Sequence, residues 1–300
     1  MTVPFSIIMP VFNRATKVRR AIDSVKRAAQ HAQVAVQIVV IDDASNDGSA
    51  EAAYSSGADI ILRLETNVGV TGARNHGIRR ATGEYLILLD SDDELLPDAL
   101  VKIKDHFASH PSTDVMFGAC VDRLKKSMHH SKTKFGSVSY EHFLVHSAPG
   151  EFLPVVKRKV FETVLFEEKL RGFEGITWLK AARSGYVLYY SHEILRLYDK
   201  EGNDRLCRRD NMLRGAHRLA IGWNYFVCEF GSDLWTLSIP AYTKAVFRWS
   251  VYERLQLPQE ATMACLPSKN AAVARIVAAV IRTFFGFVPR KVLVGLYSAR

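Results

Sequence analysis

The sequence contains no apolar stretch long enough to cross a membrane and no recognisable signal peptide. Its best candidate, residues 271–288, is interrupted by Arg275 and Arg282, so it falls short of the roughly 18 uninterrupted apolar residues of a membrane span. The start of the chain lacks the basic residues and the long apolar core of a signal peptide. We therefore expect a cytoplasmic protein without a membrane-spanning helix.

Cysteine is also scarce. The 300 residues include four cysteines, at positions 120, 207, 228 and 265, and none are paired at CxxC spacing. This usage suits a reducing compartment in which thiols stay free. The sequence therefore predicts free thiols and no disulfide framework.

Two familiar nucleotide-binding motifs are absent. No GxGxxG segment follows the first predicted strand, and no glycine-rich loop ends in GK[ST]. Their absence argues against dinucleotide binding and against hydrolysis of nucleoside triphosphates. The net charge of +9 suggests an acidic partner, but the N-terminal half has no basic stripe interleaved with aromatic residues. We therefore expect no nucleic acid partner.

Short apolar runs alternate with helical stretches over the first hundred residues. The predicted strands are 5–9, 36–41, 59–64 and 85–89, and the predicted helices are 16–29, 49–55, 71–81 and 97–107. Nearly continuous apolar runs of this length are typical of strands buried on both faces of a parallel sheet. The alternation predicts an α/β fold. From about residue 205 onward the sequence favours helices.

Polar and mostly acidic residues follow each of these four strands. They occupy positions 10–13, 42–45, 65–67 and 90–93. Because ligands of such sheets bind beyond the carboxyl ends of the strands, we expect these segments to form a binding rim. For any one segment the alternative is a helix cap or a turn, since Asp, Asn and Ser are favoured there.

The segment Asp90-Ser91-Asp92-Asp93 is the most distinctive of the four. Three carboxylates within four residues repel one another, and a divalent cation would relieve the repulsion. Mg²⁺ takes one or two carboxylates together with substrate phosphates, which suits the neutralisation of a departing diphosphate. The alternative is a solvated acidic turn before the next helix.

Two other segments offer nucleotide contacts. Asp42 and Asp43 end the second predicted strand, where a carboxylate can accept a hydrogen bond from a base or a ribose. Residues 67–78 contain glycines that let the backbone approach a phosphate, at the start of a helix whose N-terminus favours anions. Arg74, within this segment, is suited to binding a diphosphate.

The order PVFNR, DDASNDGS, NVGVTGARNHGI and GEYLILLDSDDEL resembles the motifs of glycosyltransferase family 2, over roughly residues 3–200. The resemblance implies a GT-A fold, which is Rossmann-like with a mixed, mostly parallel central sheet flanked by helices. It also implies a nucleotide-diphosphate-sugar donor, a Mg²⁺ or Mn²⁺ ion, inversion at the anomeric carbon, and a saccharide or lipid-linked acceptor. By analogy it suggests bacterial polysaccharide or lipopolysaccharide synthesis.

The resemblance also implies roles for individual residues. Asp90 and Asp92 match the DxD signature that holds the metal, with Asp92 the better candidate for direct contact, and Asp43 matches the residue that contacts the base. The expected nucleotide-sugar contacts are Pro10, Asn13, Asp42, Asp43, Asn67, Gly69, Arg74, Asp90, Ser91 and Asp92.

Inversion requires a general base on the acceptor hydroxyl. The family usually supplies an Asp from a Glu-Asp pair that opens a helix, but here Glu174 is followed by Gly175. Glu174 is therefore the predicted base and Asp93 the reserve candidate. The alternative for Glu174 is a helix-start glutamate stabilised by the helix dipole.

The missing Asp leaves a second function open, a non-catalytic nucleotide-sugar-binding or scaffold protein of the same fold. The intact Asp90-Ser91-Asp92 favours an enzyme, because a protein without catalysis has no need to retain neighbouring like charges. A nucleotidyltransferase also suits a sheet with a metal carboxylate, but the order of the motifs fits it poorly.

We expect three regions: a nucleotide-sugar-binding half at 1–110, an acceptor-binding half of the same domain at 111–204, and a helical region at 205–300. The tail from 270 to 300 is apolar and carries five basic and no acidic residues. Such a segment can lie on an anionic membrane, here the inner face of the cytoplasmic membrane. The alternative is packing on the catalytic domain or on another subunit.

Overall fold

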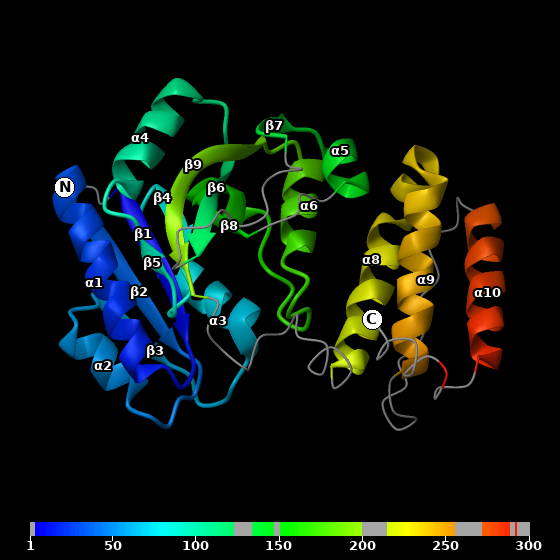
Figure 1. The fold of residues 1–300 in the computed structure, drawn as a ribbon, viewed down its shortest axis with the longest axis horizontal. Helices are drawn as coiled ribbons and strands as arrows, with labels where there is room; N and C mark the ends of the chain where they lie inside the picture. The colour runs from blue at the N-terminus through cyan, green and yellow to red at the C-terminus, as the bar shows by residue number, and fades with distance from the viewer. Residues whose placement is uncertain are drawn as a thin grey trace. The chain divides into compact units, whose positions relative to one another are not determined.

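The computed structural model describes residues 4–122, 134–146, 151–199, 215–255, 272–288 and 292. Its backbone contacts divide the chain into two units, Met1–Glu201 and Gly202–Arg300 (Figure 1). The predicted boundary at residue 205 falls within 200–214, outside the described residues. The division of the first unit at residue 110 stays a prediction.

The first unit is built on one mixed sheet, which contains nine strands within the described ranges. Its order is β3-β2-β1-β4-β8-β6-β9-β5, with β7 pairing to β9. The first four strands are parallel: β1 Phe5–Val11, β2 Val36–Asp42, β3 Ile60–Arg63 and β4 Tyr85–Leu88. The others are β5 Glu94–Leu95, β6 Val115–Asp122, β7 Gly136–Val138, β8 Phe152–Lys157 and β9 Leu188–Tyr198.

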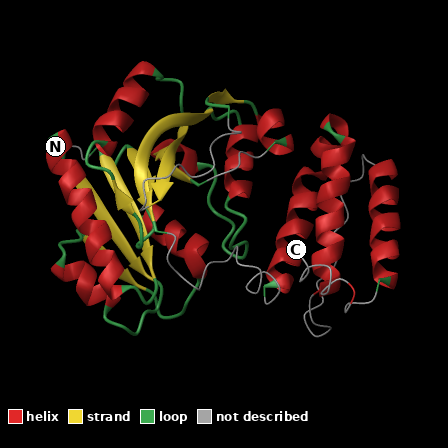
Figure 2. Cartoon of the chain, in the orientation of Figure 1, coloured by secondary structure: helices red, strands yellow, loops and turns green. Residues whose placement is uncertain are grey.

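Helices cover both faces of this sheet (Figure 2). One face packs against α1 Ala15–Ala32, α2 Ser49–Ser55 and α4 Ala99–Ser109 in a fully buried core. The other face packs against α3 Gly69–Ile78 and α6 Gly175–Arg183, and two short elements, α5 Tyr140–Val145 and η2 Arg158–Glu162, complete the unit. The predicted α/β fold with a mostly parallel sheet flanked by helices is confirmed.

The strands β1, β2 and β4 are buried along nearly their whole length, which explains their continuous apolar sequences. A close contact fixes α3 against them. A Cβ atom on Gly77 would lie 2.5 Å from the side chain of Ile41 and 2.8 Å from that of Ile8, so only glycine allows this approach. The C-terminal turn of α3 is thereby held against β1 and β2.

The second unit consists of the helices α8 Ala216–Leu237, α9 Ile239–Leu255 and α10 Ala272–Phe287. Buried Trp249 and Tyr242 of α9 and Phe230 of α8 occupy its interior. Arg282 of α10 pairs with Glu253 at 2.8 Å and lies over the Trp249 ring at 4.2 Å, which ties α10 to α9. Among the helices that the structure describes, none is long and apolar enough to cross a membrane.

Candidate active site

The loops that follow β1 and β2 are joined by hydrogen bonds. Asn13, in the positive-φ region at 51°, donates its backbone N–H to Ser45 Oγ at 3.0 Å and accepts from the Asn46 N–H at 2.9 Å. The Asp47 carboxylate accepts from the backbone N–H of Ala15 at 3.0 Å, at the start of α1. These contacts place two of the predicted rim segments side by side at the carboxyl end of the sheet.

Asp42 and Asp43 are both buried at the end of β2. Asp42 accepts from the Ser45 N–H at 2.9 Å, so it shapes the loop after its own strand. Asp43 accepts from the N–H groups of Val68 and Gly69, at 2.7 and 2.9 Å, one on each carboxylate oxygen. Asp43 therefore caps the start of α3, where backbone donors lack partners within the helix.

This cap changes the expected role of the glycine-rich segment. Two of the amides at the start of α3, which we expected to be available to a phosphate, donate to Asp43. Asn67 adds a bond from its side chain to the Asp43 carbonyl at 3.1 Å. Gly69, with φ of 78°, provides the left-handed turn that brings its N–H to the carboxylate.

Arg74 extends from α3 to the end of β4. Its guanidinium pairs with the Asp90 carboxylate at 2.7 Å and lies 5.8 Å from the centre of the Phe166 ring. Burial works to raise the pKa of Asp90, but Arg74, together with Arg196 and Arg14, brings that pKa below its ordinary value. Asp90 is thus held ionised at the rim.

Asp92 faces a different arginine. Its carboxylate pairs with Arg14, which directly precedes α1, at 3.0 Å. Burial and the neighbouring Asp90 raise the pKa of Asp92, while Arg14 and Lys17 oppose that shift. Burial is the larger cause of the raised pKa, and repulsion between the two neighbouring carboxylates adds to it.

Asp93 points away from the rim and is 1% exposed. It pairs with Arg196 of β9 at 2.9 Å and accepts from the Asp199 N–H at 3.0 Å. Burial raises the pKa of Asp93 to about 7, against the attraction of Arg196. This placement disfavours Asp93 as the base, because a buried and paired carboxylate cannot reach an acceptor hydroxyl.

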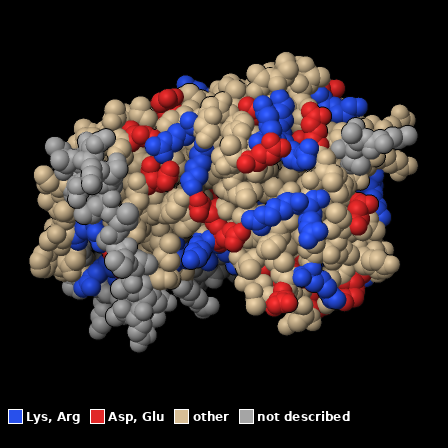
Figure 3. Space-filling model, turned by 180° about the vertical axis from the view of Figure 1, so that it is seen from behind, with Lys and Arg blue, Asp and Glu red and all other residues tan. Residues whose placement is uncertain are grey.

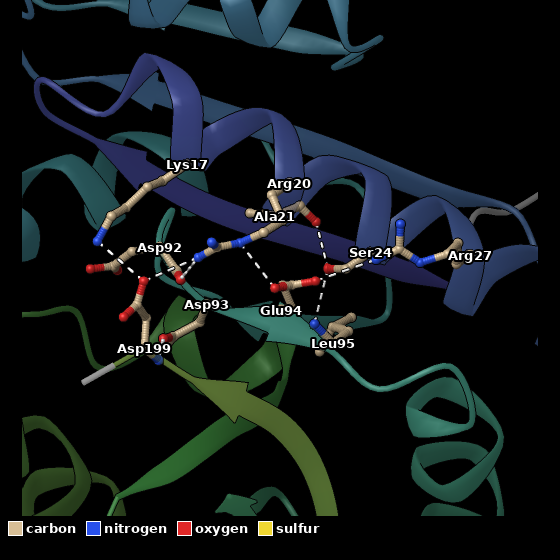
Figure 4. A network of polar contacts seen from close by, with 10 residues as sticks. All are labelled: Lys17, Arg20, Ala21, Ser24, Arg27, Asp92, Asp93, Glu94, Leu95 and Asp199. Carbon is tan, nitrogen blue, oxygen red and sulfur yellow. Dashed lines mark hydrogen bonds and ion pairs between the residues drawn. The ribbon is translucent and has the colours of Figure 1, made fainter. Parts of the chain in front are cut away.

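Basic residues of α1 hold the segment around Asp92 from the other side (Figure 4). Arg20 donates to the Asp92 carbonyl at 2.9 Å, and it pairs with Asp199 at 3.1 Å and with Glu94 at 2.9 Å. Lys17 pairs with Asp199 at 3.2 Å. The backbone of the acidic segment is therefore fixed by α1 on one side and by β9 on the other.

Glu174 lies directly before α6 and is half-buried. Its carboxylate accepts from the Gly172 N–H at 3.2 Å, and it makes no capping bond to the helix. The preceding loop packs on α3: Thr71 donates to the Glu168 carbonyl at 3.0 Å, and Asn75 exchanges hydrogen bonds with the backbone of Phe166. The loop that leads to Glu174 is thus anchored on the helix that carries Arg74.

Comparison with known proteins shows what this chain is similar to. Residues 6–151 match the family described as Glycosyl transferase family 2. A β-1,3-glucosyltransferase of Campylobacter jejuni, named for GalNAc(5)-diNAcBac-PP-undecaprenol, is 28% identical over 72% of this chain and 69% of its own length. An uncharacterised glycosyltransferase of Rickettsia typhi is 28% identical over 65% of this chain and 64% of its own. Residues 6–151 of the chain belong to glycosyltransferase family 2.

Solved structures share the fold. S. aureus TarS 1–349 in complex with UDP superposes with a TM-score of 0.59 at 15% identity, over 99% of this chain and 92% of that one. The mannosyltransferase PcManGT from Pyrobaculum calidifontis, in complex with GDP-Man and Mn²⁺, also gives 0.59, at 17% identity over 98% and 86%. The chain is a glycosyltransferase with the GT-A fold, as the sequence motifs predict.

The glycosyltransferase brings most of its predicted site residues to one end of the sheet. Pro10 lies in β1 beyond the point where β1 stops pairing with β4, and Ser91 is buried beside Asp90 and Asp92. Asp43 and Arg74 are linked through α3, and Arg74 contacts Asp90 directly. Within the described residues, no hydrogen bond or ion pair joins Glu174 to Asp90, Asp92 or Asp93.

A divalent cation fits the chemistry of two of these residues. Within the described parts of the chain, no group of three or more His, Cys, Asp or Glu side chains is arranged to hold a metal. Asp90 and Asp92 nevertheless provide two carboxylates whose mutual repulsion a cation would relieve. This donor set suits an ion that takes one or two protein carboxylates and completes its shell with phosphates and water.

Sequence reasoning missed two of the three arginines that face the aspartates, Arg14 and Arg196. Arg14 was visible only as the last letter of PVFNR, and Arg196 belongs to none of the four motifs. The distances in sequence, 78 residues from Arg14 to Asp92 and 103 from Asp93 to Arg196, leave no local pattern. The one available signal was chemical, since three neighbouring carboxylates in a folded chain require positive partners.

Proposed function

We propose that this glycosyltransferase transfers a sugar from a nucleotide-diphosphate-sugar donor to a hydroxyl acceptor, with metal assistance and with inversion. One observation carries the proposal: Arg74 and Arg14 pair with Asp90 and Asp92 at the carboxyl ends of the strands, beside the loops that follow β1 and β2. Alternating cations and carboxylates at this position suit a diphosphate and a divalent ion that bind together.

Two relatives of the same fold support the class of donor. TarS was solved in complex with UDP, and PcManGT with GDP-Man and Mn²⁺. In this chain the proposed donor contacts are the loops after β1 and β2 and the residues that link them to α3. They are Pro10, Asn13, Asp42, Asp43, Asn67, Gly69, Arg74, Asp90, Ser91 and Asp92.

We propose that Asp92, assisted by Asp90, holds Mg²⁺ or Mn²⁺. Bound there, the ion would act as a Lewis acid that neutralises charge on the departing diphosphate. Arg74 would stabilise the same charge, because its guanidinium is fixed beside Asp90 by the Phe166 ring and is only 11% exposed. Arg20 and Arg196 keep the acidic segment in place while this charge develops.

Glu174 is the proposed general base. It lies at the start of α6, after a loop that is anchored on α3, and its carboxylate is partly accessible. Gly175 beside it has open space around its Cα, so an acceptor can approach this end of α6. A carboxylate here would take the proton from the acceptor hydroxyl as that oxygen attacks the anomeric carbon.

A lipid-linked acceptor in bacterial glycan synthesis is the substrate class that we propose. The Campylobacter jejuni relative is named for an undecaprenol-linked glycan, and mycobacterial relatives are named for PGL/p-HBAD biosynthesis. An acceptor anchored in a bilayer requires the enzyme to work at a membrane surface.

The second unit offers a surface suited to that contact. On α10 the exposed residues Ile276, Val280, Phe284 and Phe287 form one apolar stripe. Val280 and Phe284, with Phe247 and Lys244 of α9, line a groove of about 510 Å³. Because the chain from 261 to 300 has no acidic residue, we propose that this unit rests on an anionic membrane surface.

Binding of a nucleoside diphosphate is the decisive experiment for the proposed function. We expect UDP or GDP to raise the melting temperature of the full chain in the presence of Mn²⁺, because a ligand that binds only the folded state stabilises it. The ion or the nucleotide alone should give a smaller shift. A chain that responds to no nucleoside diphosphate with Mn²⁺ or Mg²⁺ would not be a metal-assisted donor-binding enzyme.

The alternative is a nucleotide-sugar-binding protein without catalysis. Release of nucleoside diphosphate distinguishes the enzyme from this binding protein. The enzyme should release nucleoside diphosphate from the matching nucleotide sugar when acceptor is present, and a binding protein should not.

The face drawn in Figure 3 shows basic and acidic side chains interspersed, with no single basic stripe in view.

A further inference from the structure

Each of the three aspartates in the acidic segment has its own arginine, and the three pairs differ in accessibility. The side chains of Arg14 and Asp92 are 23% and 24% exposed, and those of Arg74 and Asp90 are 11% and 38% exposed. Those of Arg196 and Asp93 are 4% and 1% exposed. Two pairs can therefore be reached by a ligand, and the third is sealed in the protein.

The backbone around the two accessible pairs is held independently of them. The Asp92 carbonyl accepts from Arg20 at 2.9 Å, and the neighbouring Asp93 is anchored by Arg196. Arg14 is fixed through its own backbone N–H, which donates to Ser49 Oγ at 2.9 Å. The side chains of Arg14 and Asp92 can consequently change partners while the chain that carries them stays in place.

We propose that Arg14, together with Arg74, is an exchangeable counter-ion: it holds Asp92 in the donor-free enzyme and moves to the donor diphosphate when Asp92 takes up the divalent ion. This inference rests on the proposed function and deepens it. It makes Arg14 a donor-binding residue that couples binding of the ion to binding of the nucleotide.

The charges explain why the coupling arises. Two arginines and two aspartates cancel, and so do a divalent cation and a diphosphate with one negative charge on each phosphate. The cation alone would bind beside two guanidiniums, and the diphosphate alone would bind beside two carboxylates, so each is opposed by like charge. Together they give every charged group an opposite partner. By thermodynamic linkage, each ligand must then raise the affinity for the other by the same factor.

The test compares Arg14→Met with wild type in two binding measurements. Mn²⁺ alone is titrated and its free fraction is followed by electron paramagnetic resonance. UDP and GDP are titrated calorimetrically in saturating Mn²⁺. Loss of the competing cation should tighten binding of Mn²⁺ alone by roughly three- to fivefold. Loss of the guanidinium should weaken nucleotide binding by about tenfold.

Two further variants separate charge from structure. Arg14→Lys keeps the positive charge, so its affinity for Mn²⁺ alone should stay near that of wild type, while nucleotide binding weakens because lysine lacks the planar fork. Arg27→Met is the matched control on α1, because its partner is Glu94, at 3.4 Å, and not a rim aspartate. It should change neither affinity.

The outcomes distinguish this inference from the proposed function. If wild type binds nucleotide with Mn²⁺ but Arg14→Met leaves the affinity for Mn²⁺ alone unchanged or lower, the counter-ion exchange is overturned and the proposed function stands. If Arg14→Lys tightens Mn²⁺ as much as Arg14→Met does, charge is not the cause and the inference also fails. If wild type binds no nucleoside diphosphate with Mn²⁺, the proposed function fails and the inference with it.

Discussion

At the scale of single residues, Asp43 shows how one side chain can serve the fold and border the site together. Both of its carboxylate oxygens accept from backbone N–H groups at the start of α3, and the residue is only 4% exposed. Any contact with a nucleotide base must then use the remaining lone pairs or the neighbouring backbone. Removing this carboxylate would leave buried amide donors without partners and would disturb the helix that carries Arg74.

The first prediction concerns Glu174, the proposed base. Glu174→Gln keeps the size and the hydrogen-bonding shape of the side chain but cannot accept a proton. We expect the rate of sugar transfer to fall by about 10²- to 10⁴-fold, as is usual for loss of a general base, with nucleotide affinity unchanged. Glu162→Gln, at an exposed position in η2, is the control. Full activity of Glu174→Gln would remove this residue as the base.

At the scale of elements, the predicted strands and helices of the first hundred residues are confirmed. The helix predicted at 71–81 begins two residues earlier, at Gly69, because Asp43 caps it from another strand. The strand β8 was missed. Its sequence contains Pro154, and it lies antiparallel between β4 and β6, so its place depends on partners about 35 to 70 residues away.

An element-scale prediction comes from α4, where it packs on β9. His106 is 6% exposed, its ring stacks on His110 at 4.7 Å and meets Tyr189 at 4.7 Å, and its Nε2 has no hydrogen-bond partner in the described structure. Burial, with the nearby His110, lowers the pKa of His106 to about 4. The neutral ring is therefore the form that the fold accepts.

The sign of the pH effect follows from that lowered pKa. Below the ordinary histidine pKa of about 6.5, the unfolded chain binds a proton that the folded chain does not, so stability is lost as pH falls from about 6.5 toward 4. We expect His106 to account for about 2 kcal/mol of the stability lost between pH 7.5 and 5. Urea unfolding at the two pH values measures it.

His106→Phe should abolish that part of the pH dependence, because it keeps an aromatic ring and removes the titrating nitrogens. His31→Gln, at an exposed position of α1, is the control and should leave the pH dependence as in wild type. A His106→Phe variant with the full pH dependence of wild type would contradict the assignment.

At the scale of the whole molecule, the chain combines a catalytic unit with a smaller helical unit whose helix α10 has an exposed apolar stripe. The end of the tail, at 289–291 and 293–300, lies outside the described residues. The helix α10 is described, and its exposed apolar stripe agrees with a segment that binds a membrane surface without crossing it.

The membrane contact is tested with vesicles. The full chain should bind vesicles that contain phosphatidylglycerol and should bind phosphatidylcholine vesicles much less, with binding reduced by salt. The double variant Phe284→Ser, Phe287→Ser should bind at least about fivefold more weakly, since two exposed aromatic rings no longer enter the interface.

Tyr54→Ser is the matched control for this test, because Tyr54 is an aromatic residue of the first unit that is 76% exposed. Equal vesicle binding by wild type and the double variant would contradict the proposal that the apolar stripe of α10 contacts the membrane. A wild-type dimer that the double variant breaks would instead assign the stripe to contact between copies of the chain.

The sequence by itself determined the class of fold, the positions of the first strands along the chain and the acidic residues that follow them. Continuous apolar runs and the residues that end them are local features. Tertiary structure decided which charge meets which. Arg14, Arg74 and Arg196 come from a loop, a helix and a distant strand, and only the order of strands in the sheet and the packing of α1 and α3 against it bring each one to its own aspartate. An ion pair forms only where two opposite charges come within a few ångströms, so its partners are fixed by position in space and leave no periodic pattern in the chain.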